Sequence, residues 1–175
     1  MRSREAVAPI QSGMVVGLGT GKTASFALPI LHRLIHPRKQ TPAKSCRVLV
    51  LSPTRELSGQ ILDSFHAYGR HLRLSATLAI GGVPMGRQVR AVMPGVDIMV
   101  ATPGRLLDLV RGNALKLNQV EFLVLDEADR MLDMGFINDI RKIVAKLPIK
   151  RQTLFFSATM PKEIADLADQ MLNNP

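Results

Sequence analysis

Short apolar runs rich in valine, isoleucine and leucine alternate along the chain with longer stretches whose apolar positions recur at helical spacing. Most of the short runs are continuously apolar, as expected of strands that are covered on both faces. Such alternation is typical of strand-helix units around a mostly parallel sheet. The pattern therefore predicts an open, three-layer α/β fold with helices on both faces of the sheet. The predicted strands are residues 14–16, 47–52, 75–80, 97–101, 122–126 and 153–157.

The longer stretches carry apolar stripes that predict helices facing the core. Pro29 interrupts the first stripe, and we expect that helix to bend or restart there because proline removes a helical hydrogen bond. Polar and basic residues with two prolines fill residues 37–45, and glycines cluster in residues 81–86, so both segments are predicted to be loops. The stripes comprise Phe26, Ala27, Ile30, Leu31, Leu34 and Ile35; Leu57, Ile61 and Phe65; and Ile140, Ile143, Val144 and Leu147.

At 175 residues, 46% hydrophobic and 21% charged, the chain has the composition of a globular protein, and we expect one domain over residues 1–175. No apolar run approaches the roughly 20 residues of a membrane-spanning helix, and the N-terminus lacks the apolar block of a secretory signal. The single cysteine, Cys46, cannot form an internal disulfide and fits a reducing compartment. We therefore expect a cytoplasmic protein without a membrane segment, and we expect it to be a monomer.

The formal net charge of +9 is large for this length. It favours an acidic partner such as nucleic acid, although a basic surface without a specific ligand would carry the same charge. Aromatic residues make up 4% of the chain and tryptophan is absent, so little of the surface is suited to stacking on bases. Binding to nucleic acid is therefore expected to depend on the sugar-phosphate backbone.

A glycine-containing segment follows the first predicted strand and precedes a helical stretch. Its glycines let backbone N–H groups turn toward phosphate oxygens, and the N-terminus of the following helix favours negative charge. In such a loop the lysine reaches the β- and γ-phosphates, and the hydroxyl of the next residue ligates Mg²⁺. We assign these two roles to Lys22 and Thr23. The segment that we expect to bind the nucleotide comprises Gly19, Thr20, Gly21, Lys22 and Thr23.

Two carboxylates emerge at the end of the predicted strand 122–126, where Glu127 follows Asp126. In a nucleoside triphosphatase, Asp126 would hold Mg²⁺, usually through water, and Glu127 would orient or deprotonate the attacking water. The alternative is a pair of helix-capping acids, because acidic residues favour the first turn of a helix. The presence of Lys22 and Thr23 in the same α/β pattern favours the triphosphatase, with Lys22, Asp126 and Glu127 as catalytic residues.

Five short motifs follow the predicted strands in order. They are Pro53-Thr54-Arg55-Glu56-Leu57, Gly81-Gly82, Thr102-Pro103-Gly104-Arg105, Asp126-Glu127-Ala128-Asp129 and Ser157-Ala158-Thr159. In order and separation they resemble the motifs of DEAD-box RNA helicases, and the resemblance runs from about residue 15 to the end of the chain. It implies a RecA-like P-loop NTPase domain that uses ATP and Mg²⁺ and binds RNA.

The resemblance also implies roles for the remaining motifs. Ser157 and Thr159 would couple ATP hydrolysis to strand separation through hydrogen bonds to Asp129. The other motifs would contact the RNA backbone, because arginines supply charge, threonines supply hydroxyls and glycines allow a close approach to phosphate. The implied RNA-binding residues are Pro53, Thr54, Arg55, Gly82, Thr102, Pro103, Gly104 and Arg105.

Each of these roles has a purely structural alternative. Thr54 could cap the helix that follows it, and Arg105 could pair with Asp108 on its own helix. Ser157 and Thr159 could cap the last helix. The occurrence of all five motifs in order favours the functional roles.

The N-terminal part departs from the family pattern. Gln11 resembles the glutamine that contacts adenine in the family, but only Ser12 and Gly13 separate it from the first predicted strand. Val16 stands where the full phosphate-loop signature has its first glycine. A natural deletion, an engineered deletion and residues omitted from the sequence would each explain this. A truly shortened loop would weaken ATP binding, because each lost hydrogen bond to a charged group costs about 1.5–3 kcal/mol.

The family pattern further implies a second RecA-like domain, whose arginines contact the transferring phosphate. Such arginines contribute about 10³–10⁵ in rate in related phosphoryl-transfer enzymes, so this chain alone is expected to be inactive or weakly active. The predicted function is the ATP-binding lobe of an RNA helicase that couples ATP binding and hydrolysis to RNA duplex separation. A DNA helicase or translocase remains an alternative, as does a non-catalytic RNA-binding or partner-binding module.

Overall fold

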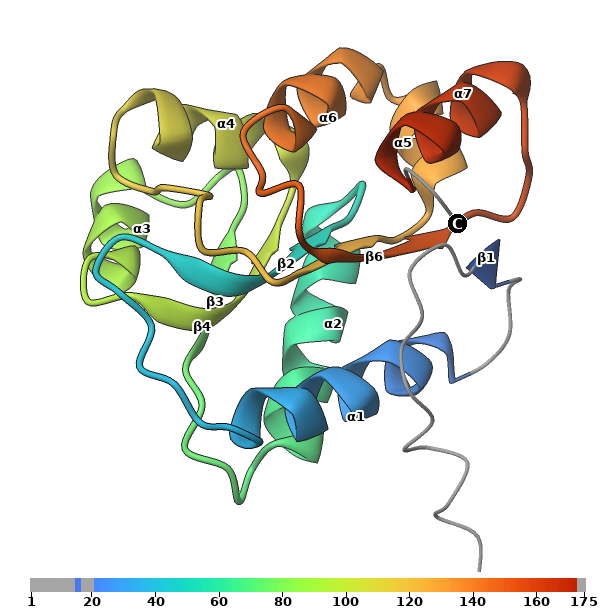
Figure 1. Ribbon diagram of the computed structural model, residues 1–175. Helices are drawn as coiled ribbons and strands as arrows, with labels where there is room; N and C mark the ends of the chain where they lie inside the picture. Colours follow the sequence, from blue (N-terminus) through green and yellow to red (C-terminus); the bar gives the residue numbers. More distant parts are fainter. Residues whose placement is uncertain (1–14, 17–20, 173–175) are drawn as a thin grey trace, which may run out of the picture.

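Strands and helices alternate in the computed structural model of the protein, which describes residues 15–16 and 21–172 (Figure 1). The strands are β1 (Val15–Val16), β2 (Cys46–Leu51), β3 (Ala76–Ala79), β4 (Val96–Ala101), β5 (Phe122–Leu125) and β6 (Gln152–Phe156). The helices are α1 (Lys22–Ile35), α2 (Arg55–Tyr68), α3 (Met85–Val92), α4 (Pro103–Arg111), α5 (Ala128–Asp133), α6 (Ile137–Val144) and α7 (Lys162–Met171).

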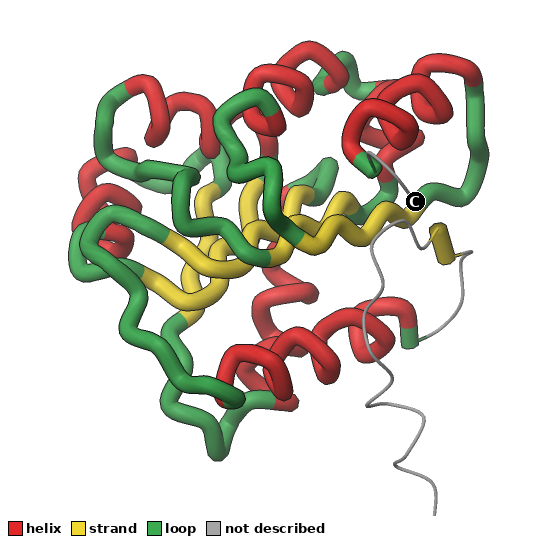
Figure 2. The backbone as a smooth tube through the Cα atoms, viewed as in Figure 1, coloured by secondary structure: helices red, strands yellow, loops and turns green. Residues whose placement is uncertain are grey.

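The strands form one parallel six-stranded sheet in the order β1-β6-β5-β2-β4-β3 (Figure 2). Leu51 at the end of β2 is in register with Ala101 of β4 and with Leu125 of β5. Ala79 at the end of β3 is in register with Ala101 as well. Because the strands are parallel and end together, the segments that follow them meet along one margin, which we call the carboxyl edge. The segments that precede the strands meet along the opposite margin, the amino edge.

Buried side chains of the strands alternate between two cores. Leu49 of β2 packs in the core that contains α3 to α7, whereas Val48 and Val50 pack in the core formed with α1 and α2. In the second core the ring of Phe26 in α1 lies 5.4 Å, centroid to centroid, from the ring of Phe156 in β6. Figure 1 shows α1 and α2 on one face of the sheet and α4 to α7 on the other. The predicted three-layer α/β fold is therefore confirmed.

The predicted strands agree with the structure to within one residue at every described end, and residue 14 lies outside the described residues. Helix α1 continues through Pro29, which is buried, so the predicted restart at this residue is wrong. The packing of α1 against the sheet and α2 holds the helix together across the missing N–H. Gly86, which we expected in a loop, lies in α3. Among the described residues, no helix is long and apolar enough to cross a membrane.

Candidate functional site

Helix α1 begins at the carboxyl edge, directly after a glycine with left-handed backbone. Gly21 has φ 98°, a conformation that favours glycine because it has no Cβ, and its carbonyl accepts a hydrogen bond from the N–H of Ser25. No acidic residue lies in the first turn of α1, so the helix itself does not neutralise the positive end of its dipole. This geometry suits an anion. Gln11, Gly19 and Thr20, which we predicted to bind the nucleotide, lie outside the described residues.

The first residue of α1 contacts the residue that follows β5. Lys22 Nζ lies 2.5 Å from Asp126 Oδ1, and the two side chains are 12% and 0% exposed. Asp126 is fixed by its backbone N–H, which donates to the carbonyl of Leu51 in the neighbouring strand. The structure thus brings together two of the three residues that we predicted to be catalytic. Thr23 is the second residue of α1 and is half-buried.

The carboxylate of Asp126 is buried without the hydrogen bonds that usually accompany burial. Neither oxygen accepts a hydrogen bond of good geometry from the described residues, although native buried polar groups nearly always do. Burial raises the pKa of Asp126 above its ordinary value, and the nearby Lys22 only partly offsets this effect. The arrangement leaves coordination capacity that suits a divalent cation.

Glu127 occupies a strained backbone position next to Asp126. Its φ is 52°, in the left-handed region that costs a residue with a Cβ about 1 kcal/mol or more. Although Glu127 precedes α5, its side chain makes no capping hydrogen bond and instead lies 3.3 Å from Arg130 Nη1. Glu127 therefore occupies the N-cap position of α5 but does not cap the helix through a side-chain hydrogen bond. Strain of this kind clusters at functional sites.

Two arginines hold the glycine-containing loop between β3 and α3. Arg55 Nη1 lies 3.5 Å from the carbonyl of Gly81. Gly82 has φ 77°, and a Cβ there would collide with the Arg55 guanidinium. Arg105 Nη1 donates to the carbonyl of Val83 at 2.7 Å on the other side of this loop. Three motifs that are far apart in sequence are therefore adjacent at the carboxyl edge.

The structural alternatives for Thr54 and Arg105 have different outcomes. Thr54 is the N-cap of α2, and its hydroxyl accepts from the N–H of Leu57, so the capping interpretation is confirmed. Arg105 Nε lies 4.0 Å from Asp108 Oδ2, at the limit of an ion pair, whereas the shorter contacts of Arg105 are to other elements.

The remaining predicted RNA-binding residues lie at the starts of two helices. Pro103 and Gly104 form the first turn of α4, and Thr102 is the N-cap residue of that helix. Pro53 is buried before α2.

Buried polar residues that the sequence analysis did not identify support these motifs. Gln88 of α3 is 4% exposed and accepts from Arg105 Nη1 while donating to the carbonyl of Ile80. Ser52 and Ser58 share a hydrogen bond of 2.5 Å beneath the start of α2. Gln88 lies four residues before the buried Val92, so helical spacing places both side chains on the core-facing side of the helix. This spacing is the sequence signal that could have revealed the burial of Gln88.

Asp129 joins α5 to the segment that follows β6. Thr159 donates to Asp129 Oδ2 from its backbone N–H at 3.1 Å and from its hydroxyl at 2.9 Å. The N–H of Asp129 donates to Ser157 Oγ at 3.2 Å. Slight burial raises the pKa of Asp129, but the hydrogen bonds from Thr159 outweigh it and hold the pKa below its usual value. The predicted contacts are present, and the cap of α7 is instead Pro161.

Comparison with known proteins gives consistent matches. The family model described as DEAD/DEAH box helicase matches residues 4–167. DEAD-box ATP-dependent RNA helicase 40 of Oryza sativa subsp. japonica is 49% identical over 158 residues, which are 90% of this chain and 20% of that protein. RNA helicase CrhR of Synechocystis is 46% identical over 157 residues, which are 90% of this chain and 31% of that protein.

Solved structures match as well. A DEAD box protein from the hyperthermophile Methanococcus jannaschii superimposes with a TM-score of 0.82 at 35% identity, over 94% of this chain and 44% of that one. A hypothetical ATP-dependent RNA helicase from Sulfolobus tokodaii gives a TM-score of 0.79 at 40% identity, over 91% of this chain and 45% of that one. The chain therefore spans less than half the length of each of these relatives.

Proposed function

Because this chain belongs to the DEAD/DEAH box helicase family, we propose that it is the ATP-binding lobe of an RNA helicase that couples ATP binding and hydrolysis to RNA duplex separation. The observation that carries this proposal is the contact between Lys22 and Asp126. A cation at the start of α1 and a buried carboxylate directly after β5 can serve the phosphates and the metal ion of one nucleotide.

The residues present fit magnesium and ATP. Magnesium in nucleotide sites keeps several waters and takes one or two carboxylates together with phosphate oxygens. Asp126, whose buried carboxylate is contacted by Lys22 but accepts no hydrogen bond of good geometry from the described residues, suits that coordination. The hydroxyl of Thr23 is the second candidate ligand. The metal would neutralise charge on the phosphates. Lys22 would bind the phosphates, and Glu127 would orient the attacking water and accept its proton.

The rest of the carboxyl edge would hold RNA and communicate with the nucleotide. Arg55, Gly82 and Arg105 lie around one loop and would bind the sugar-phosphate backbone, together with Pro53, Thr54, Thr102, Pro103 and Gly104. Asp129, hydrogen-bonded to both Ser157 and Thr159, would transmit the state of the nucleotide from α5 to the segment after β6. A second RecA-like domain would complete the site, and we propose a monomer that acts in the cytoplasm.

Nucleotide titration of the 175-residue chain tests this proposal. Fluorescent ADP with Mg²⁺ should bind the wild-type chain, and Lys22→Ala should weaken binding about 100-fold, since hydrogen bonds to charged phosphates contribute about 1.5–3 kcal/mol each. RNA affinity should stay nearly constant. Lys162→Ala is a matched control, because Lys162 is also the first residue of a helix that follows a strand, and it should leave nucleotide affinity unchanged.

The alternatives predict other results. Equal affinity of Lys22→Ala and wild type for the nucleotide would show that the site is assigned wrongly. A chain that binds RNA but never binds ADP or ATP would be a non-catalytic RNA-binding module. For a longer protein that includes the second domain, stimulation of ATP hydrolysis by DNA and not by RNA would identify a DNA translocase.

A further inference from the structure

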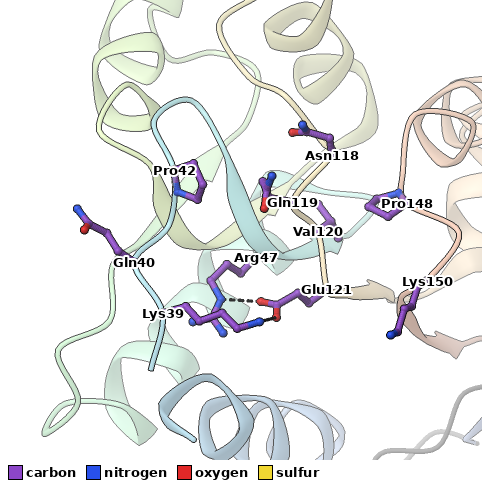
Figure 3. A pocket seen from close by; sticks show the side chains of 10 residues that line it. All are labelled: Lys39, Gln40, Pro42, Arg47, Asn118, Gln119, Val120, Glu121, Pro148 and Lys150. Carbon is purple, nitrogen blue, oxygen red and sulfur yellow. Dashed lines mark hydrogen bonds and ion pairs between the residues drawn. The ribbon is translucent and has the colours of Figure 1, made fainter. Parts of the chain in front are cut away.

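The amino edge of the sheet is hollowed by two adjoining cavities. One, of about 410 Å³, lies between the segments 38–41, 73–75 and 94–97. The other, of about 210 Å³, extends past Arg47 and Glu121 to Lys150 (Figure 3). Lys39 and Gln40 line both cavities. We call the combined hollow the amino-edge groove.

Positive charge predominates in the amino-edge groove. The exposed cations in its lining are Arg38, Lys39, Arg73 and Lys150. The lining also includes Arg47, which is buried and lies 2.6 Å from Glu121. The charged side chains therefore comprise more cations than acids, and most of the cations face solvent.

The two acids of the groove are already engaged by protein groups. Asp97 accepts hydrogen bonds from the Thr41 hydroxyl and from the N–H of Ser75. Glu121 is paired with Arg47 and with Lys39, and Figure 3 shows both contacts. Arg38, Arg73 and Lys150 make no ion pair with the described residues. Arg38 Nη2 donates to the carbonyl of Arg73 at 2.7 Å. The charge of all three residues thus remains without an acidic partner among the described residues and can attract an anionic ligand.

The chemistry of the lining favours a phosphate backbone over a protein partner. Protein interfaces are anchored by buried aromatic side chains, and no aromatic residue lines either cavity in the part of the chain that the structure describes. The lining instead provides hydrogen-bond donors from arginine guanidinium groups, lysine ammonium groups and the amide of Gln40. These donors match phosphate and ribose oxygens. A cationic groove whose described lining has no aromatic side chain is suited to a polyanion whose sequence is not read.

We propose that the amino-edge groove is a second binding surface for the sugar-phosphate backbone of RNA, separate from the motifs at the carboxyl edge. This inference rests on the proposed function, because it takes RNA as the ligand. A strand rises about 3.3 Å per residue, so the six residues of β2 place the two edges roughly 20 Å apart. The groove would therefore bind nucleotides that flank those held at the carboxyl edge.

A double substitution of exposed groove residues tests this inference. The variant Arg73→Gln with Lys150→Gln removes one arginine and one lysine from the groove and touches no ion pair of the described residues. The control Arg141→Gln with Lys142→Gln makes the same charge change on the exposed face of α6, outside the groove. Fluorescence anisotropy with a labelled single-stranded RNA of about 20 nucleotides, measured across a range of salt concentrations, gives both affinity and salt slope.

The groove variant should bind this RNA about tenfold more weakly than the control at about 0.15 M salt, with a salt slope shallower by about 1.4, because each contact to single-stranded phosphate contributes about 0.7. Equal affinities and slopes for the two double variants, with unchanged thermal unfolding, would overturn the inference. So would a groove variant that keeps RNA affinity but loses binding to a labelled oligoglutamate, because the groove would then be a protein-docking surface.

A parallel measurement on Arg105→Ala separates failure of this inference from failure of the proposed function. If Arg105→Ala weakens RNA binding while the groove variant equals its control, RNA binds only at the carboxyl edge and the second surface does not exist. If the wild-type chain binds no RNA at all, both the proposed function and the inference are wrong.

Discussion

Two buried aspartates at opposite edges of the same sheet have opposite surroundings. Asp97, near the start of β4, is 9% exposed, and its carboxylate accepts from the Thr41 hydroxyl and from both the N–H and the hydroxyl of Ser75. Asp126, after the end of β5, is fully buried and accepts no hydrogen bond of good geometry from the described residues. Asp126 has the ion pair with Lys22 in place of such bonds.

The difference separates a structural role from a functional one. A buried carboxylate with all its hydrogen bonds stabilises the fold and has little capacity left for a ligand. A buried carboxylate without these hydrogen bonds destabilises the fold unless a ligand supplies the missing interactions. Local destabilisation of this kind is common at functional sites. The surroundings of Asp97 therefore indicate a structural role at the start of β4, whereas those of Asp126 indicate a ligand-binding role at the end of β5.

Replacing each aspartate by asparagine tests this comparison most strongly. Asp97→Asn exchanges an acceptor for an N–H₂ group beside the Ser75 N–H, and we expect the free energy of unfolding to fall by about 2 kcal/mol. Asp126→Asn removes a buried charge, and Lys22 can turn toward solvent, so the change should be under about 1 kcal/mol. Urea unfolding of the two variants measures both values.

For nucleotide binding, the larger effect of the two substitutions should come from Asp126→Asn and the smaller from Asp97→Asn. Asp126→Asn is expected to lose Mg²⁺-dependent binding of fluorescent ADP, while Asp97→Asn, measured below its unfolding temperature, keeps it. Equal destabilisation by the two substitutions would contradict the distinction between the edges.

The pairing of Glu121 with Arg47 should make the stability of the amino edge depend on pH. Partial burial raises the pKa of Glu121, but Arg47 and Lys39 outweigh it and hold the pKa below its ordinary value. A carboxylate with a lowered folded-state pKa contributes stability above its unfolded pKa and loses it as pH falls through the folded one. Glu121→Gln should therefore cost about 1 kcal/mol near neutral pH, a value reduced by the exposure of the pair.

The cost of Glu121→Gln should disappear on acidification. The unfolding free energies of wild type and Glu121→Gln are expected to approach each other as pH falls below the ordinary pKa of glutamate, and to meet below the lowered folded-state pKa of Glu121. Glu163→Gln on the exposed first turn of α7 is the control and should change stability little at any pH. A difference between wild type and Glu121→Gln that stays constant down to pH 3 would show that the ion pair does not stabilise this edge.

Sequence reasoning succeeded where one chain segment carried the whole signal. The strands were predicted because continuous apolar runs mark buried parallel strands. Lys22 and Asp126 were assigned to one nucleotide site because each lies in a recognisable local motif, and the structure places them in contact. The contacts between Asp129 and Thr159 were implied by the family resemblance. The predicted roles in binding and catalysis stay predictions.

Contacts that depend on packing between distant segments were not predictable in the same way. Arg47 and Glu121 are 74 positions apart in the chain and meet only because β2 and β5 are neighbours with a particular register. Gln88 contacts Arg105 because of the position of α3 beside α4, which no local pattern specifies. The continuity of α1 through Pro29 likewise depends on packing and not on helix propensity.

Arg105 challenges the comparison between the edges, because it lies at the carboxyl edge yet has well-formed contacts to Val83 and Gln88. If Arg105 only braces the loop, Arg105→Ala should lower stability and leave RNA affinity unchanged. We expect instead about fourfold weaker binding of single-stranded RNA at about 0.15 M salt and a salt slope shallower by about 0.7, as for one lost phosphate contact. Arg111→Ala at the exposed end of the same helix is the control. Because Arg105 has donors beyond the Nη1 that contacts the loop, the same side chain can brace the loop and bind phosphate.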